Sequence, residues 1–184
     1  KWMIYDKDNN IVPANSTYLK AENRVFMGNA IPKCMLSMDH SFSYRHFDLS
    51  LQFHSWLDFD IYNANAMYNG IRTKTGTNVL RDWYYDHKEI KDGDHVLTDY
   101  FLEDGSFLKI DAITLGYTLP MQKWTKDYLQ SLRFYFTARD VACWTNYSGY
   151  NPEVTATGLF PGTELPNIGY PMAARFTFGI QMNF

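Results

Sequence analysis

The chain has 184 residues, of which 17% are aromatic, and its formal net charge at pH 7 is -3. This small negative charge gives no electrostatic basis for binding nucleic acid, whose phosphates require a basic surface. No apolar run approaches the roughly 20 residues that a membrane-spanning helix requires, which excludes a helical membrane protein.

The first feature along the chain is the stretch Asp6-Lys7-Asp8-Asn9-Asn10. Oxygen-bearing side chains at alternate positions, on Asp6, Asp8 and Asn10, are typical of part of a calcium-binding loop. The glycine and the distal glutamate that such a loop needs are missing. We therefore expect an ordinary polar loop, with a structural calcium ion as the alternative, and no other cofactor.

Alternation of apolar and polar residues with period two then predicts strands at 33–44 and 47–59. Phe47, Leu49, Leu51 and Phe53 share one face, with Asp48, Ser50, Gln52 and His54 on the other. A tight hairpin at Arg45-His46 would join the two strands. His40 falls on the apolar face, where a polar side chain would be costly in a bilayer.

Three further strands are predicted at 107–119, 131–142 and 173–184. In the first of them, Leu108 and Ile110 are out of phase with Ile113 and Leu115. This change of phase predicts a β-bulge near Asp111. The final strand alternates without a break, with its apolar face formed by Phe176, Phe178, Ile180, Met182 and Phe184.

The connections between these strands differ greatly in length. Two are short, and two are long, at residues 60–106 and 143–172. Long loops on one side of a sheet and short turns on the other are typical of an outer-membrane β-barrel. The alternative is a soluble antiparallel β-sandwich, which would bind carbohydrate through its aromatic loops. Five strands are fewer than the roughly eight that close a membrane barrel, so we expect a segment of a larger assembly.

Several stretches in the same order carry a family resemblance. They are FSYRHFDLS at 42–50, DYFLEDGSFLK at 99–109, ITLGYTLP at 113–120 and YSGYNPE at 147–153. Together with the alternation that ends at Phe184, they resemble the C-terminal part of the SusC/RagA family of TonB-dependent outer-membrane transporters. The resemblance covers the chain from about residue 24 to its end.

The resemblance implies an all-β fold, with these strands as the last five of a transmembrane barrel of about 22 antiparallel strands with long extracellular loops. Residues 1–184 would belong to one barrel domain, with the plug outside this chain. The resemblance also implies TonB-dependent import of oligosaccharides or peptides, in a complex with a SusD-like surface lipoprotein. The protein would lie in outer-membrane lipid with its C-terminus on the periplasmic side. The apolar residues of strand 173–184, from Phe176 to Phe184, resemble the signal that barrel-assembly machinery recognises.

No catalytic constellation is present, since the chain has no HExxH, GxSxG or paired-cysteine motif, and we expect no enzyme. Aromatic loop residues could contact a ligand or the lid protein, or pack the loops on themselves; they are Trp83, Tyr84, Tyr85, Trp144, Tyr147 and Tyr150. Four side chains are predicted to face the barrel interior, where plug contact is the first expectation and ligand contact the second; they are His54, Trp56, Arg133 and Arg139. Cys34 and Cys143 would lie three strands apart, about 14 Å at the usual spacing, which predicts free thiols.

Overall fold

The computed structural model describes residues 2–15, 17–71, 78–86, 96–125, 128–154, 162–166 and 170–184. The chain forms two compact units. The loop unit combines Lys1–Pro32, Phe59–Gly105 and Tyr147–Tyr170, and the sheet unit combines Lys33–Asp58, Ser106–Asn146 and Pro171–Phe184. Among the described residues, no helix is long and apolar enough to cross a membrane.

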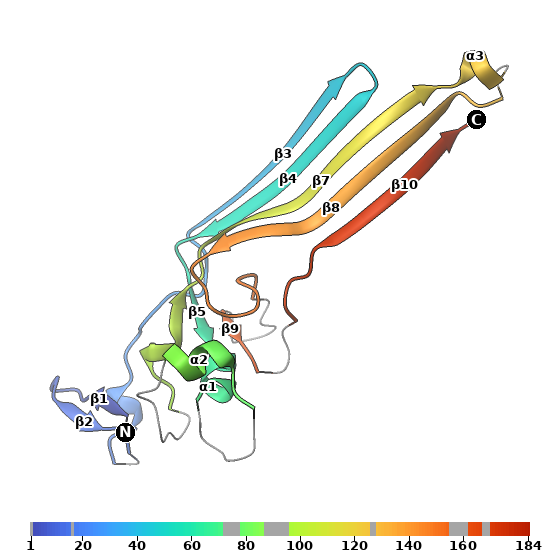
Figure 1. Ribbon diagram of the computed structural model, residues 1–184. Coiled ribbons are helices and arrows are strands. Elements are labelled where there is room, and N and C mark those ends of the chain that lie inside the picture. Colours follow the sequence, from blue (N-terminus) through green and yellow to red (C-terminus); the bar gives the residue numbers. More distant parts are fainter. Residues whose placement is uncertain are drawn as a thin grey trace. The chain divides into compact units, whose positions relative to one another are not determined.

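The sheet unit is one antiparallel sheet of five long strands (Figure 1). These strands are β3 (Cys34–Tyr44), β4 (Phe47–Leu57), β7 (Phe107–Pro120), β8 (Ser131–Thr145) and β10 (Arg175–Asn183), in the order β10-β8-β7-β4-β3. The short helix α3 (Gln122–Thr125) lies in the connection between β7 and β8. The five antiparallel strands predicted from alternation are confirmed, although β8 continues three residues past its predicted end at 142.

The register of the central strands changes at a β-bulge. Between β4 and β7 the shift falls at Gln52/Phe53, and between β7 and β8 it falls at Ile110/Ala112. Asp111 is therefore an extra residue relative to β4, which confirms the predicted bulge. Past the bulge Ile110 pairs with Phe53, so the out-of-phase residues rejoin the apolar face.

The loop unit contains short elements that the sequence did not predict. Its three-stranded sheet has the order β6 (Leu102–Asp104), β5 (Asp60–Asn63) and β9 (Thr163–Glu164), and β1 (Met3–Tyr5) pairs with β2 (Ile11–Pro13). Its helical elements are η1 (Ala21–Asn23), α1 (Ala64–Asn69), α2 (Arg81–Asp86) and η2 (Asp99–Phe101). Elements of two to six residues are too short to show a period, which is why alternation failed to find them. Parts of both long connections lie outside the described residues.

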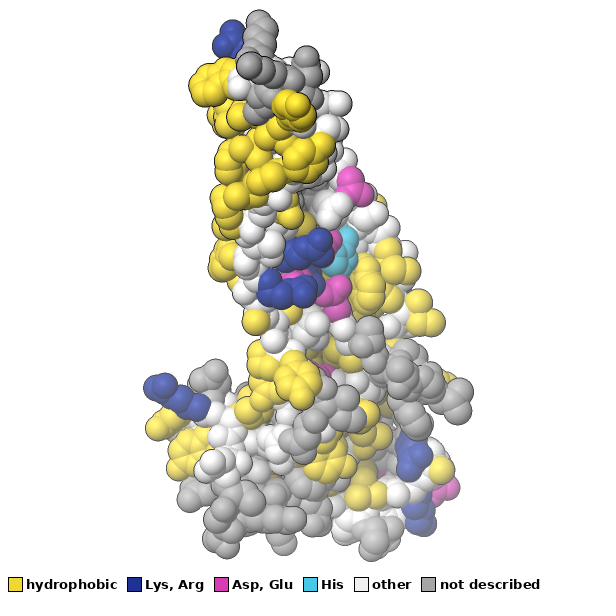
Figure 2. Space-filling model, turned by 90° about the vertical axis from the view of Figure 1, so that its right-hand side faces the viewer, with side chains coloured by type: hydrophobic (Ala, Val, Ile, Leu, Met, Phe, Trp, Pro, Cys, Tyr) yellow, Lys and Arg dark blue, Asp and Glu magenta, His cyan; other side chains and the backbone are white. Residues whose placement is uncertain are grey.

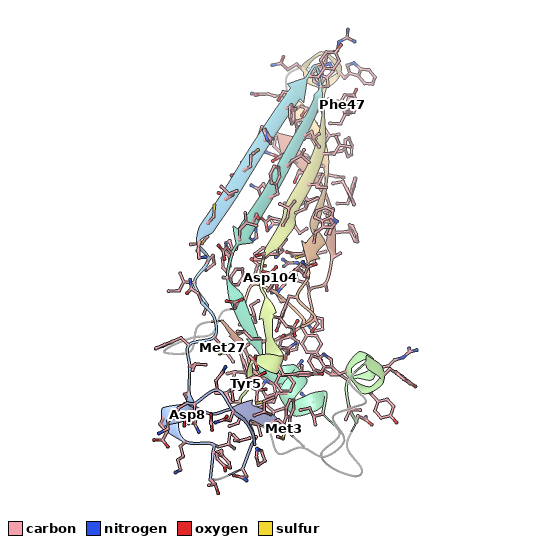
Figure 3. The ribbon with its side chains drawn as sticks, turned by 90° about the vertical axis from the view of Figure 1, so that its left-hand side faces the viewer. Met3, Tyr5, Asp8, Met27, Phe47 and Asp104 are labelled. Carbon is pink, nitrogen blue, oxygen red and sulfur yellow. The ribbon has the colours of Figure 1, made fainter. Side chains whose placement is uncertain are left out.

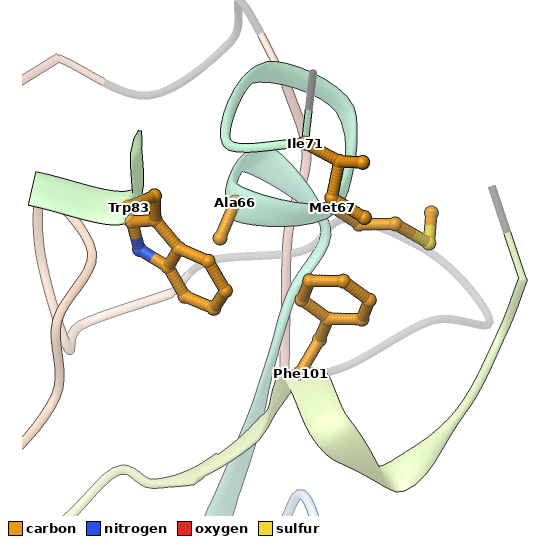
Figure 4. Close-up of a cluster of buried hydrophobic side chains, with 5 residues drawn as sticks. All are labelled: Ala66, Met67, Ile71, Trp83 and Phe101. Carbon is orange, nitrogen blue, oxygen red and sulfur yellow. The ribbon is translucent and has the colours of Figure 1, made fainter. Parts of the chain in front are cut away.

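An aromatic core orders the loop unit (Figure 4). Phe101 is fully buried and stacks on Trp83 with ring centroids 5.6 Å apart, and Ala66, Met67 and Ile71 complete the cluster. Helix α1 begins next to this core because the Asn63 side chain accepts a hydrogen bond from the Ala66 amide at 2.8 Å, which caps the helix. The loop unit is thus a packed structure with a hydrophobic centre of its own.

Candidate functional site

One face of the five-stranded sheet is apolar and exposed. Phe178 pairs with Phe136 and Phe176 with Ala138, so the alternating residues of neighbouring strands share this face. Phe176 and Phe178 are 66% and 67% exposed, and no second sheet covers them within the described part of the sheet unit. Figure 2 shows hydrophobic side chains gathered along the strands. A continuous apolar patch of this kind marks a surface that meets lipid or protein rather than water.

His40 lies on this apolar face, as its parity predicts. Its Nε2 atom is 2.6 Å from the sulfur of Met38, and its ring stacks on Phe42 with centroids 5.8 Å apart. The His40 imidazole therefore contacts two side chains of its own strand. These contacts lower the free-energy cost of a polar ring on an apolar surface.

Aromatic residues mark the hairpin end of the sheet, where Figure 3 labels Phe47. The rings of Phe47 and Tyr117 lie 4.6 Å apart, and the Arg45 guanidinium lies over the Tyr44 ring at 5.3 Å. Tyr44 is 69% exposed. Exposed aromatic rings next to a basic side chain are typical of the boundary between hydrocarbon and lipid headgroups.

The opposite face of the sheet is polar, and ion pairs connect its strands. Arg133 of β8 binds Asp48 of β4 through two hydrogen bonds, Nη2 to Oδ2 at 2.5 Å and Nε to Oδ1 at 3.1 Å. The pair reaches across the intervening strand β7 directly over Gly116, which pairs with Asp48. A side chain at position 116 would meet the Asp48 carboxylate and the Arg133 guanidinium, so glycine is what lets the two strands connect here.

We expect Gly116→Leu to separate Asp48 from Arg133 and to lower the free energy of unfolding by about 1–3 kcal/mol, the usual cost of overpacking. Urea unfolding of the full-length protein in lipid would measure this loss. A double-mutant cycle with Asp48→Ser is the control, because the cost of Gly116→Leu must shrink once the ion pair is gone. If Gly116→Leu costs as much without the ion pair as with it, Gly116 is required for the backbone of β7 rather than for the contact between Asp48 and Arg133.

A second group of charged residues lies around the bulge. His54 Nδ1 is 2.6 Å from Asp111 Oδ2, and Lys109 Nζ is 3.0 Å from Asp140 Oδ1. Arg175 Nη2 binds the other oxygen of Asp140 at 2.8 Å. Figure 2 shows basic, acidic and histidine side chains gathered together. The sequence analysis did not identify Lys109 as a residue of the polar face, because the bulge reverses the alternation of β7. The change of phase at the bulge was the one signal that could have identified it.

The four side chains predicted to face the barrel interior share this polar face. By pairing, Trp56 lies opposite Phe107, His54 opposite Lys109, and Arg133 opposite Gln181. The fourth, Arg139, is exposed. Their contacts to a plug or a ligand stay a prediction.

The loop unit has a polar network of its own, which is buried at Tyr147 and Glu164. The Glu103 carboxylate accepts hydrogen bonds from Asn63 Nδ2 at 2.9 Å, from the Ser148 amide at 2.7 Å and from the Ser148 hydroxyl at 2.8 Å. The Tyr147 hydroxyl donates to Glu164, which also accepts from the Tyr150 amide at 3.1 Å. Burial raises the pKa of the Glu164 carboxyl, and burial next to this carboxylate raises the pKa of the Tyr147 hydroxyl.

Glu164→Gln should stabilise the loop unit most at neutral and higher pH. The pKa of Glu164 is raised in the folded state. The stability that this carboxyl contributes is therefore fully present below its unfolded pKa of 4.5 and is lost as pH rises through the folded pKa. Glutamine keeps an oxygen for the Tyr147 hydroxyl and carries no charge. Resistance of the loop unit to proteolysis, compared between the two proteins from pH 4 to 8, measures this difference. The exposed substitution Glu22→Gln is the control, and a difference that does not grow with pH would contradict the expectation.

The aromatic residues predicted as ligand or lid contacts lie in different environments. Trp83 belongs to the core and Tyr147 is 6% exposed, so both pack the loop unit on itself. Tyr85 is 57% exposed, and Tyr84 and Tyr150 are each 39% exposed. The structure corrects the position of Trp144, which lies in β8 opposite Leu108 on the apolar face rather than in a loop. It was misplaced because β8 continues past the bulge.

The candidate calcium loop is the turn between β1 and β2 (Figure 3). The Asp6 Oδ1 atom accepts hydrogen bonds from the amides of Asp8 at 2.9 Å and Asn10 at 2.8 Å. The Asn10 bond is the main reason that the pKa of Asp6 is lowered. In the described part of the chain, no three His, Cys, Asp or Glu side chains form a group that could hold a metal ion. An ion at Asp6, Asp8 and Asn10 stays a prediction.

Cys34 and Cys143 are not joined by a disulfide in the structure. Cys34 lies in β3 and Cys143 in β8, and two strands, β4 and β7, separate them in the sheet.

Known proteins with a similar sequence or fold agree with this two-faced sheet. No family model matches the chain. The chain is 24% identical to the TonB-dependent receptor P3 of Formosa agariphila over 90% of its length, and 28% identical to the TonB-dependent receptor SusC of Bacteroides thetaiotaomicron over 91%. The closed-closed structure of the RagAB peptide importer superposes on the whole chain with a TM-score of 0.71 at 20% identity. These likenesses confirm the resemblance to the SusC/RagA family that the sequence predicted.

The chain spans 18% of the length of receptor P3, 16% of SusC and 21% of the matched RagAB chain. The superposition shows that the five-stranded sheet has the fold of part of the RagAB barrel. The soluble β-sandwich, the alternative left open by the sequence, is therefore wrong. Its aromatic side chains would be buried between two sheets, whereas Phe176 and Phe178 are exposed.

Proposed function

We propose that this segment forms part of the wall of an outer-membrane barrel that imports a nutrient in a TonB-dependent manner, without a chemical step. The observation that carries the proposal is the two-faced sheet, with an exposed apolar face and an ion-paired polar face. A bilayer requires an apolar outer face on a closed barrel, whereas an aqueous or plugged interior favours charged and hydroxyl side chains. Relatives named as TonB-dependent receptors support this assignment.

The proposed cargo is a peptide or an oligosaccharide, and the proposed partner is a SusD-like surface lipoprotein. The name of the RagAB peptide importer supports the first class of cargo. Tyr84, Tyr85 and Tyr150 present exposed rings in the loop unit, and such rings bind sugars or peptides with little loss of side-chain entropy. The proposed orientation places the hairpin ends of the strands, and the C-terminus next to them, on the periplasmic side.

The experiment uses cells that express the full-length protein and synthesise the partner lipoprotein. Outer-membrane fractionation reads the location, and uptake of labelled peptides and oligosaccharides is compared between cells with and without functional TonB. We expect the protein in the outer-membrane fraction and uptake of at least one labelled compound that stops when TonB is removed. Recovery of the protein in the soluble fraction, or uptake that is indifferent to TonB, would overturn the proposal.

A further inference from the structure

Two arginine side chains lie directly opposite each other on the polar face of the sheet. Arg139 of β8 is the pairing partner of Arg175 of β10, so both side chains project to the same face. The Arg175 side chain is 69% exposed, and Arg139 is exposed as well. Like charges directly opposite each other destabilise a pair of strands. A sheet with such a pair therefore gains stability when an anion binds between them.

Arg175 is fixed in position by a chain of ion pairs. The Lys109 side chain is only 8% exposed and binds Asp140, whose other oxygen binds Arg175. Asp140 has a φ of 54°, an unfavourable value for a residue other than glycine, and it lies where the β7–β8 register shifts. Bulges redirect side chains next to functional sites, and backbone strain of this kind concentrates there.

Arg139 differs from the other basic residues of this face, because within the described residues it forms no ion pair. In the row of the sheet that it occupies, its neighbour on β7 is Ala112, and the next residue, on β4, is Gln52. Ala112 is buried, and its methyl group offers Arg139 neither a charge nor a hydrogen-bond acceptor. Within the described residues, the N–H donors of the exposed Arg139 guanidinium are therefore not engaged in an ion pair.

The charges near the pair do not balance. Lys109, Arg139 and Arg175 carry three positive charges here, against the two carboxylates of Asp140 and Asp111. Thr177 pairs with Thr137 at a position two residues away from the arginine pair. Both hydroxyl groups lie on the same face as the arginines and add hydrogen-bond donors. The surface thus combines an excess of positive charge with additional hydrogen-bond donors.

We infer that Arg139 and Arg175 form a binding site for a carboxylate group of an imported solute, such as an acidic peptide or a uronic-acid oligosaccharide. The planar guanidinium fork matches the two oxygens of a carboxylate, and two opposed forks hold it more tightly than one. Lys109 and Asp140 are positioning residues that fix Arg175. This inference rests on the proposed import function.

The test measures equilibrium binding to the purified full-length protein, with two matched pairs of probes. One pair is a tetrapeptide with two glutamates and the same peptide with two glutamines. The other is a tetrasaccharide of galacturonate and its neutral galactose counterpart. We expect wild type to bind at least one acidic probe about tenfold more tightly than its neutral counterpart, and Arg139→Gln and Arg175→Gln each to remove most of that preference.

Arg45→Gln is the matched control, since it removes the same charge from the hairpin turn and should leave the preference unchanged. An acidic preference that is absent in wild type, or unaltered in Arg139→Gln, would overturn the site while leaving TonB-dependent uptake in cells untouched.

The carboxylate that binds Arg139 could come from a solute or from an acidic residue of the protein itself. The unfolding temperature of Arg139→Gln, measured without any probe, distinguishes these two sources. We expect it to equal or exceed that of wild type, because repulsion is relieved. A fall would show that Arg139 already binds an acidic residue of the protein itself and would overturn the solute site.

Discussion

Phe178→Arg is expected to prevent most of the full-length protein from assembling in the outer membrane. The substitution places a charge on the exposed apolar face, where Phe178 is 67% exposed and pairs with Phe136. An arginine on the lipid face of a barrel costs about 2–4 kcal/mol near the middle of the bilayer. The measurement is the amount of protein in the outer-membrane fraction that keeps its folded mobility in unheated electrophoresis samples.

Two controls accompany this substitution. Phe178→Leu keeps the apolar character and should assemble normally, which separates the charge from the loss of an aromatic ring. Ser41→Arg puts the same charge on the polar face, opposite Ser50, and should also be tolerated. If Ser41→Arg were as damaging as Phe178→Arg, the assignment of the two faces would be wrong.

Phe101→Ala is expected to unfold the loop unit while the sheet unit stays assembled. Phe101 is fully buried among Trp2, Tyr62 and Trp83, and its removal leaves a cavity that costs about 3–5 kcal/mol. Since the described part of the loop unit has one small core cluster, this loss is large relative to its stability. Limited proteolysis of the full-length protein in detergent should cut residues 59–105 rapidly, with the folded mobility of the barrel unchanged.

Leu97→Ala is the control for Phe101→Ala, because Leu97 is 73% exposed and its truncation leaves no cavity. It should resist proteolysis as wild type does. Loss of the folded mobility in Phe101→Ala would mean that the two units unfold together. In that case the loop core would contribute to assembly of the barrel wall as well as to the loops.

Local alternation was enough to predict the strands, because each residue of a sheet has only two faces to choose between. Phe47 to Phe53 and Phe176 to Phe184 alternate without interruption, and their strands were predicted to within two residues. The phase change at Ile110 even located the bulge. The loop core was not predictable in this way, since Phe101, Trp83 and Met67 come from separate short segments with no period. For Trp83 and Tyr147, the alternatives of ligand or lid contact and of packing within the loops were both open in the sequence, and the structure shows both residues buried.

The sequence by itself determined that this protein has a sheet with one apolar face and one polar face, because that information is repeated at every second residue. Only the tertiary structure decided which polar residues meet. Asp48 and Arg133 are 85 positions apart, and they pair because Gly116 leaves room on the strand between them. Arg139 and Arg175 face each other because of the register of β8 and β10. Such pairings depend on strand order and register, which the alternation of a single strand does not encode.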